Sequence, residues 1–309
     1  MIPAGAREAL WHTPDGHAVR RFDWPAASDR PRGAILFMPG RGDAYEKYLA
    51  SFHHWHDRGW HVSAADWRGQ AGSGRLGLDD RTGHVDDFSV WLQDLAAFWA
   101  DWASDRPGPL VLIGHSMGGH LVLRAVADGL LHPAPAALVL SAPMLDILPA
   151  RVPAVAKYWF ARVRRAMGDR RRPAWKQGEM PLSSVAARQG LLTHDSGCYG
   201  DELWWREQRP QIHMGAASWG WIVAALASIR HLKRPRILRC VSVPVFMLAT
   251  TADRLVSPPA IARAAALLPD AQCLWFGAEA AHEILREAEP VRRRALDGID
   301  AFLDRVCPS

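Results

Sequence analysis

The chain has 309 residues, of which 49% are hydrophobic and 22% charged, a balance typical of a globular protein with a large core rather than of a disordered or fibrous chain. Its 37 basic and 32 acidic residues leave a formal charge of +5, a weak excess that is accompanied by no zinc-finger or aromatic RNA-binding spacing. We therefore expect no nucleic-acid partner.

The N-terminal stretch contains no basic segment followed by an apolar core, so no signal peptide is expected. The longest apolar runs are much shorter than a membrane span. The cysteines are widely spaced and form no C-x-x-C pair, which indicates reduced, mostly buried thiols at Cys198, Cys240, Cys273 and Cys307. These features predict a soluble, cytoplasmic protein.

Six short apolar runs have the length and composition of β-strands. The runs are nearly continuous rather than alternating, which is typical of parallel strands that are buried on both faces. The predicted strands, in chain order, are Ala34–Met38, Trp60–Asp66, Leu110–Gly114, Ala136–Ala142, Val243–Thr250 and Ala271–Phe276.

Helical periodicity separates these strands. Apolar residues recur at steps of three and four from Val85 to Trp102, and again just after Ser116. Strands that alternate with helices predict an α/β fold with a mostly parallel, doubly wound sheet. The alternation fails between Leu145 and Leu238, where amphipathic stretches such as Val152–Met167 occur without a convincing strand. We predict an α/β core of residues 1–144 and 239–309, interrupted by a helical cap of residues 145–238.

The five residues Gly114–Gly118 join the third predicted strand to the helix that follows it. They match the pattern G-x-S-x-G, in which small residues allow a very sharp strand-to-helix turn. Such a turn exposes the Ser116 hydroxyl above the sheet, where the backbone N–H of Met117 can donate to a developing oxyanion. We predict Ser116 as a nucleophile and Met117 as an oxyanion donor; an ordinary glycine turn is the alternative.

A serine nucleophile needs a base, and the base needs an acid that orients it. On a sheet with this turn the expected chain order is serine, acid, histidine. Asp253 follows the fifth predicted strand and His282 follows the last, so both loops lie at the sheet edge where Ser116 is expected. We predict Asp253 as the acid and His282 as the base. Asp146, after the fourth predicted strand, is the alternative acid.

The second oxyanion donor is expected in the loop after the first predicted strand, Met38–Tyr48. Gly40 and Gly42 let the backbone of this loop approach a substrate closely. We predict the backbone N–H of Arg41 as the donor; a surface loop without this role is the alternative.

Other residue clusters predict no additional chemistry. His115 lies inside the sharp turn, and we expect its side chain to be structural and to point away from the reaction partner of Ser116. The glycine-rich stretch Arg68–Gly77 lacks the Lys-Ser/Thr of a phosphate-binding loop, so we interpret it as a support for the turn. No group of His, Cys and carboxylate residues has metal-ligand spacing. The sequence therefore predicts neither a metal nor a cofactor.

Five motifs, in this order and at family-like spacing, resemble the lysophospholipase and monoacylglycerol lipase branch of the α/β-hydrolases: GRGDAYEKY, DWRGQAGSGR, GHSMGG, TTADRLVSP and HEILRE. The resemblance covers nearly the whole chain and is weakest in the cap. It implies the α/β-hydrolase fold and hydrolysis of carboxylic esters with one fatty acyl chain. One departure is that Pro39-Gly40 replaces the usual His-Gly before the oxyanion loop. The site residues that the resemblance implies are the triad of Ser116, Asp253 and His282 and the oxyanion donors Arg41 and Met117.

The predicted cap is rich in tryptophan and arginine. In the family that the chain resembles, the cap covers the acyl pocket, so we expect cap tryptophans to line this pocket or its entrance; the alternative is that they pack the cap onto the core. The tryptophans concerned are Trp204, Trp205, Trp219 and Trp221. Six arginines between Arg162 and Arg172 form either a solvated helix face or a peripheral contact with anionic lipid.

Our leading interpretation is a serine ester hydrolase that acts on lysophospholipids or monoacylglycerols through a Ser-His-Asp triad and an acyl-enzyme. A small-ester carboxylesterase or a proline-type aminopeptidase on the same fold is the alternative, as is a non-catalytic binding protein, although no triad member is missing. A haloalkane dehalogenase would need a carboxylate in place of Ser116. An aminopeptidase would need cap carboxylates to bind a free amine, for which the candidates are Glu179, Asp195, Asp201, Glu202 and Glu207.

Overall fold

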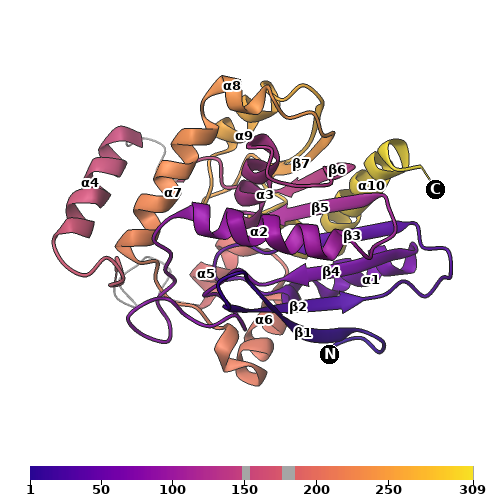
Figure 1. Cartoon of the computed structure of the whole chain (residues 1–309), viewed down its shortest axis with the longest axis horizontal. Helices are drawn as coiled ribbons and strands as arrows, with labels where there is room; N and C mark the ends of the chain where they lie inside the picture. The colour runs from indigo at the N-terminus through magenta and orange to yellow at the C-terminus, as the bar shows by residue number, and fades with distance from the viewer. Residues whose placement is uncertain (148–153, 176–184, 309) are drawn as a thin grey trace.

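An eight-stranded, mostly parallel sheet forms the centre of the computed structural model, which describes residues 1–147, 154–175 and 185–308 (Figure 1). The strand order is β1-β2-β4-β3-β5-β6-β7-β8, and every neighbouring pair from β4 to β8 is parallel. The strands are β1 (Arg7–His12), β2 (Ala18–Trp24), β3 (Gly33–Met38), β4 (Trp60–Ala65), β5 (Leu110–His115), β6 (Ala137–Ser141), β7 (Val245–Thr250) and β8 (Ala271–Phe276).

All six predicted strands are present, and the prediction of a doubly wound α/β fold is confirmed. The prediction missed β1 and β2, which form an antiparallel hairpin at one edge of the sheet. Five of the six residues of β1 are exposed, and β2 interrupts its apolar positions with Arg20, Arg21 and Asp23. Edge strands bury little surface, so they lack the continuous apolar runs by which the central strands were found.

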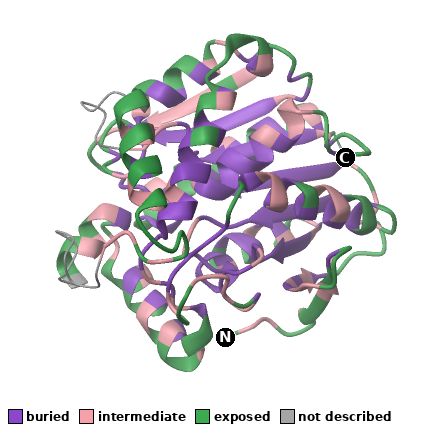
Figure 2. Cartoon of the chain, turned by 60° about the vertical axis from the view of Figure 1, so that its left-hand side comes forward, coloured by how far each residue is buried: buried purple, intermediate pink, exposed green. Residues whose placement is uncertain are grey.

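Helices cover both faces of the sheet, and the strands are buried between them (Figure 2). Alternate residues of each strand point to opposite layers: Leu36 packs with the helices on one face, and Phe37 with those on the other. The first layer contains α2 (Phe88–Ala103), α3 (Met117–Ala127) and α9 (Pro258–Ala265); the second contains α1 (Leu49–Asp57) and α10 (Glu289–Val306).

Apart from turns and isolated β-bridges, the described chain between β6 and β7 forms helices. It contains α4 (Ala154–Ala166), α5 (Val185–Leu192), α6 (Ser196–Gln208), the 3-10 turn η2 (Pro210–Ile212), α7 (Trp219–Leu232) and α8 (Pro235–Leu238). Trp221 of α7 packs against Phe88 of α2, with ring centroids 5.9 Å apart, so α7 connects this segment to the core. Helix α4 packs on α7 at the periphery of the molecule (Figure 1).

Within the described ranges, no helix is both long enough and apolar enough to cross a membrane. The four cysteines are free, as expected, but they are less buried than predicted. Only Cys307 is fully buried, since it lies at the end of α10 against the core, whereas Cys240 is exposed.

Candidate active site

Ser116 lies at the turn between β5 and α3, with its backbone in the left-handed region at φ +52°. This conformation is uncommon for a residue with a side chain and persists only where the surroundings impose it. Here the Ser116 N–H donates to the Ser141 carbonyl at 2.9 Å, and its own carbonyl accepts from the N–H groups of His120 and Met144. These hydrogen bonds fix the turn that presents the hydroxyl above the sheet.

The glycines of the turn are required by close packing. A Cβ atom on Gly114 would lie 2.7 Å from both Gly119 N and Val122 Cγ2, and one on Gly118 would collide with the carbonyl oxygens of Met38 and Pro39. Only glycine therefore lets α3 start this close to β5 and to the loop after β3. The G-x-S-x-G pattern is accordingly a steric requirement of this turn, and the alternative of an accidental glycine turn has no support in the packing.

The side chains of Ser116, His282 and Asp253 form a hydrogen-bonded chain. Ser116 Oγ lies 2.8 Å from His282 Nε2, and His282 Nδ1 lies 2.7 Å from Asp253 Oδ2. The other carboxylate oxygen of Asp253 accepts from the backbone N–H groups of Leu255 and Val256, which fixes its orientation. Since Nδ1 donates to the carboxylate, Nε2 is the nitrogen that can accept the serine proton.

Asp146, the alternative acid, is engaged elsewhere. Its carboxylate accepts from Lys233 Nζ at 2.5 Å and contacts Lys157. The hydrogen-bonded partner of His282 is therefore Asp253.

The surroundings of His282 favour the protonated form of its imidazole. Burial alone would lower the pKa of this imidazole, but the charge and the hydrogen bond of Asp253 outweigh burial, so the pKa is raised above its ordinary value. For Asp253, burial alone would raise the pKa. The charge and the hydrogen bond of His282 outweigh burial, so the pKa of this carboxyl is lowered and the group stays ionised.

The loop after β3 lies directly against Ser116. A Cβ atom on Gly40 would be 3.2 Å from Ser116 Cβ, so the absence of a side chain is what permits this approach. The backbone N–H groups of Arg41 and Met117 donate no hydrogen bond within the parts of the chain that the structure describes. Both are therefore available to an oxygen bound beside Ser116. The glycine-rich stretch supports this loop, since Gln70 accepts from the Gly42 N–H at 2.9 Å.

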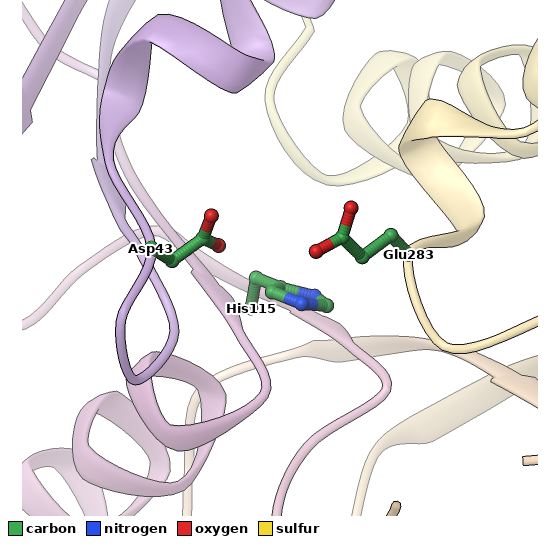
Figure 3. A group of neighbouring side chains, drawn as sticks. All are labelled: Asp43, His115 and Glu283. Atoms are coloured by element: carbon green, nitrogen blue, oxygen red, sulfur yellow. The ribbon is translucent and has the colours of Figure 1, made fainter. Parts of the chain in front are cut away.

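His115 does not point away from His282, as was expected from its place in the turn. Its ring lies 4.9 Å from the ring of His282, close to Asp43 and Glu283. Figure 3 shows the carboxylates of Asp43 and Glu283 directed toward each other beside the His115 ring. Burial, together with the nearby His282, lowers the pKa of His115 to about 4, so it is neutral at physiological pH.

Asp43, His115 and Glu283 come close enough together to hold a cation, but an ammonium group already lies among them. Lys47 Nζ is 2.9 Å from Asp43, 2.5 Å from Glu283 and 3.0 Å from Glu202. Burial raises the pKa of each of these carboxyls, and the Lys47 charge outweighs burial so that all three pKa values are lowered. The cluster is therefore balanced by a lysine, and its residues do not call for a metal.

These residues belong to a buried ion cluster that was not predicted from the sequence. We call it the Lys47 cluster; its members are Asp43, Lys47, Glu202, Glu283 and Arg286. It joins the oxyanion loop, helix α6 and the turn η3 (Ile284–Arg286) that follows His282. A visible signal was the Glu283-Arg286 spacing, which permits an ion pair across one turn. Nothing in the sequence places Lys47 or Glu202 beside that pair, because the three segments are far apart along the chain.

The four cap tryptophans do not gather around one space. Trp205 packs with Ala44 and Ile212, and Trp219, at the start of α7, packs against α4. Trp204 is 42% exposed. Trp221 contacts Arg41 of the loop after β3, whose guanidinium lies 5.2 Å from its ring centroid. For Trp205 and Trp219 these contacts favour the alternative that they pack the cap.

Comparison with known proteins identifies relatives over most of the chain. A family profile described as "Serine aminopeptidase, S33" matches residues 29–289. Lysophospholipase L2 of Escherichia coli K12 is 28% identical over 284 residues, covering 88% of this chain and 80% of that protein. A monoacylglycerol lipase of Mycolicibacterium smegmatis is 32% identical over 129 residues, covering 40% of this chain and 41% of the relative.

A solved structure shows the same fold. A soluble variant of monoglyceride lipase from Saccharomyces cerevisiae, in complex with a substrate analogue, superposes with a TM-score of 0.79. The alignment covers 100% of this chain and 98% of that one at 17% identity, so the likeness concerns the architecture.

We predict that Lys47→Met lowers the free energy of unfolding by about 3–5 kcal/mol, because three buried carboxylates lose their shared cation. Lys233→Met is the matched control: Lys233 pairs with Asp146 but is 33% exposed, so its loss costs at most about 1 kcal/mol. Urea denaturation of both variants measures the difference. Equal losses would mean that the Lys47 cluster contributes no more than a surface ion pair.

Proposed function

Because the chain belongs to the family described as "Serine aminopeptidase, S33", and is thus a hydrolase, we propose that it hydrolyses the ester of a monoacyl lipid. The observation that carries the proposal is the 2.8 Å hydrogen bond between Ser116 Oγ and the only nitrogen of His282 that Asp253 leaves free. This arrangement activates a hydroxyl for attack on a carbonyl carbon.

In the proposed mechanism, Ser116 Oγ attacks the ester carbonyl while His282 Nε2 takes the serine proton. The backbone N–H groups of Arg41 and Met117 stabilise the negative charge on the carbonyl oxygen. As the carbon–oxygen bond of the alcohol breaks, the proton passes from His282 to that oxygen, leaving an acyl group on Ser116. Water then attacks this acyl-enzyme with His282 again as base, releasing a fatty acid and restoring the hydroxyl.

The substrate class is supported by the relatives. Both proteins compared by sequence are named for lipids with a single acyl chain, a lysophospholipid and a monoacylglycerol. The relative that aligns with most of this chain is a lysophospholipase.

An aminopeptidase, the activity in the family description, finds less support in the acidic residues of the cap. Glu202 is occupied by Lys47 and arginines, and Asp195 caps α6 by accepting from the Cys198 N–H. Asp201 and Glu207 are exposed, and Glu179 lies outside the described residues. Among the carboxylates that the structure describes, none of these is buried and free to bind an amine.

We predict that the purified protein hydrolyses long-chain monoacyl esters in preference to acetyl esters, by up to about fourfold for each buried methylene. Ser116→Ala is expected to lower turnover by a factor on the order of 10⁶. Ser141→Ala is the matched control, since Ser141 is buried on β6 and its hydroxyl has no partner in the described chain. Fatty acid release from monoacylglycerols and lysophospholipids measures both effects. Faster cleavage of an aminoacyl naphthylamide than of any ester would contradict the proposal.

Helix α4 is the candidate for contact with a lipid surface. Its apolar residues Val155, Trp159 and Val163 follow one another at steps of four, and each is more than half exposed. The opposite face packs through Ala161, which is buried against α7. Arg162 lies beside the apolar stripe, with its guanidinium 5.3 Å from the Trp159 ring centroid, and the exposed Arg170 and Arg171 follow the helix. An apolar face beside arginines suits the interface of an anionic membrane.

We predict that Trp159→Gln weakens binding to vesicles of phosphatidylcholine and phosphatidylglycerol by about tenfold, because the indole no longer enters the interface. Leu10→Gln is the control, since Leu10 is 60% exposed but lies on β1. Sedimentation with vesicles measures binding. If both variants bind like the wild type, or if phosphatidylcholine alone binds equally well, α4 does not dock on anionic lipid.

A further inference from the structure

The side chain of Arg41 carries a positive charge that the fold does not neutralise. Its Nη2 donates to the Gly215 carbonyl at 2.8 Å, and its guanidinium lies over the ring of Trp221. Its Nε is buried and has no hydrogen-bond partner, and no carboxylate of the described chain forms an ion pair with it. Burial and the neighbouring charge of Arg188 lower the pKa of Arg41 to about 10, so the group is still cationic at neutral pH.

Arg188 of α5 is also poorly balanced. Its Nη2 lies 3.5 Å from Glu202, and its Nε is buried without a partner. Glu202 is shared with Lys47, Arg206 and Arg286, all at 3.1 Å or less. Lys47 and Arg286 also pair with Glu283, so the three carboxylates of the Lys47 cluster face four cations, and Arg188 has the longest ion pair of the four.

The surroundings of these two arginines add positive charge. Burial, with the charges of Arg206, Arg81, Arg188 and Arg75, lowers the pKa of His213 to about 4. Arg81 Nη1 lies 2.5 Å from His213 Nδ1, and Arg75 donates to the carbonyls of Gln211 and His213. A buried cation without a counter-ion is costly. Arg188 and Arg81 are partly exposed, at 37% and 42%, whereas the Arg41 guanidinium is buried among these positive charges without a carboxylate, and this combination indicates an anionic ligand.

The Arg41 guanidinium lies near the place where the ester is proposed to bind. Arg41 is the residue whose backbone N–H is proposed to hold the ester oxygen, so its guanidinium lies one side-chain length from the reacting carbonyl. The glycerol unit that separates the ester from the phosphate in a lysophospholipid has a comparable length. A guanidinium also presents parallel N–H donors that match two phosphate oxygens.

We propose that Arg41 and Arg188 bind the phosphate of the substrate head group, so that the preferred substrates are lysophospholipids rather than neutral monoacylglycerols. The inference rests on the proposed function, since it concerns the alcohol side of the same ester. An uncharged head group would leave the Arg41 guanidinium without a counter-ion.

The test uses octanoyl lysophosphatidylglycerol and octanoylglycerol, which share one acyl chain and are used below the concentration at which they form micelles. We expect the wild type to favour the phosphate-bearing ester in kcat/KM by at least about tenfold, and Arg41→Met to lower this ratio by about tenfold. Arg188→Met is the second variant. Because Arg188 is 37% exposed, its replacement is expected to lower the free energy of unfolding less than Arg41→Met does. Arg236→Met, at an exposed position of α8, is the control and is expected to keep the wild-type ratio.

A second arm separates a lipid head group from free phosphate. Inorganic phosphate and glycerol 3-phosphate are tested as inhibitors of octanoylglycerol hydrolysis, and glycerol 3-phosphate is expected to compete in the wild type and less in Arg41→Met. Inhibition by inorganic phosphate without any preference for the lysophospholipid would overturn the head-group assignment. An equal ratio in the wild type and both binding-site variants would overturn the site itself. Failure to cleave either ester would instead contradict the proposed function.

Discussion

The left-handed turn at Ser116 is the constraint on which the candidate site depends. It can form only because Gly114 and Gly118 let α3 begin in contact with β5 and with the loop after β3. The same closeness brings the backbone N–H of Met117 and the loop at Gly40 to the serine. Because β5, β7 and β8 are parallel, the loops after β7 and β8 begin at the same edge of the sheet as the Ser116 turn. These loops place Asp253 and His282 beside the serine. A larger residue at either glycine would therefore disturb Ser116 and the proposed oxyanion donors together.

A second layer of interactions holds these loops relative to one another. Lys47 connects the oxyanion loop to Glu283, the residue after His282, and to Glu202 in the helical segment between β6 and β7. The backbone N–H of Glu283 also donates to the Leu192 carbonyl at 2.8 Å, so α5 is connected to the same loop. Buried ion pairs thus hold the loops that carry the proposed catalytic residues, and Arg41 and Arg188, which lie beside this cluster, supply the proposed phosphate contact.

Much of the architecture could be predicted from the sequence because the central strands are buried on both faces and read as continuous apolar runs. The hairpin of β1 and β2 could not, since an exposed edge carries no such run. The meeting of Ser116, Asp253 and His282 follows from their places after parallel strands. The side of the turn that His115 faces, and the partners of Lys47, depend on packing between distant segments, which local patterns do not encode. The apolar stripe of α4 was visible in the sequence, but its exposure to solvent was not.

Covalent labelling by a fluorophosphonate, measured for its site and its rate, is the direct test of the role proposed for Ser116. Peptide mass spectrometry is expected to find one adduct for each chain, on Ser116 Oγ, and labelling is expected to slow strongly in His282→Gln. Only the neutral imidazole can accept the serine proton, so the rate should rise with pH through a pKa above the ordinary 6.5 of histidine, since Asp253 raises the pKa of His282. No adduct on Ser116, or an equal labelling rate in His282→Gln, would contradict the assignment of Ser116 as a nucleophile activated by His282.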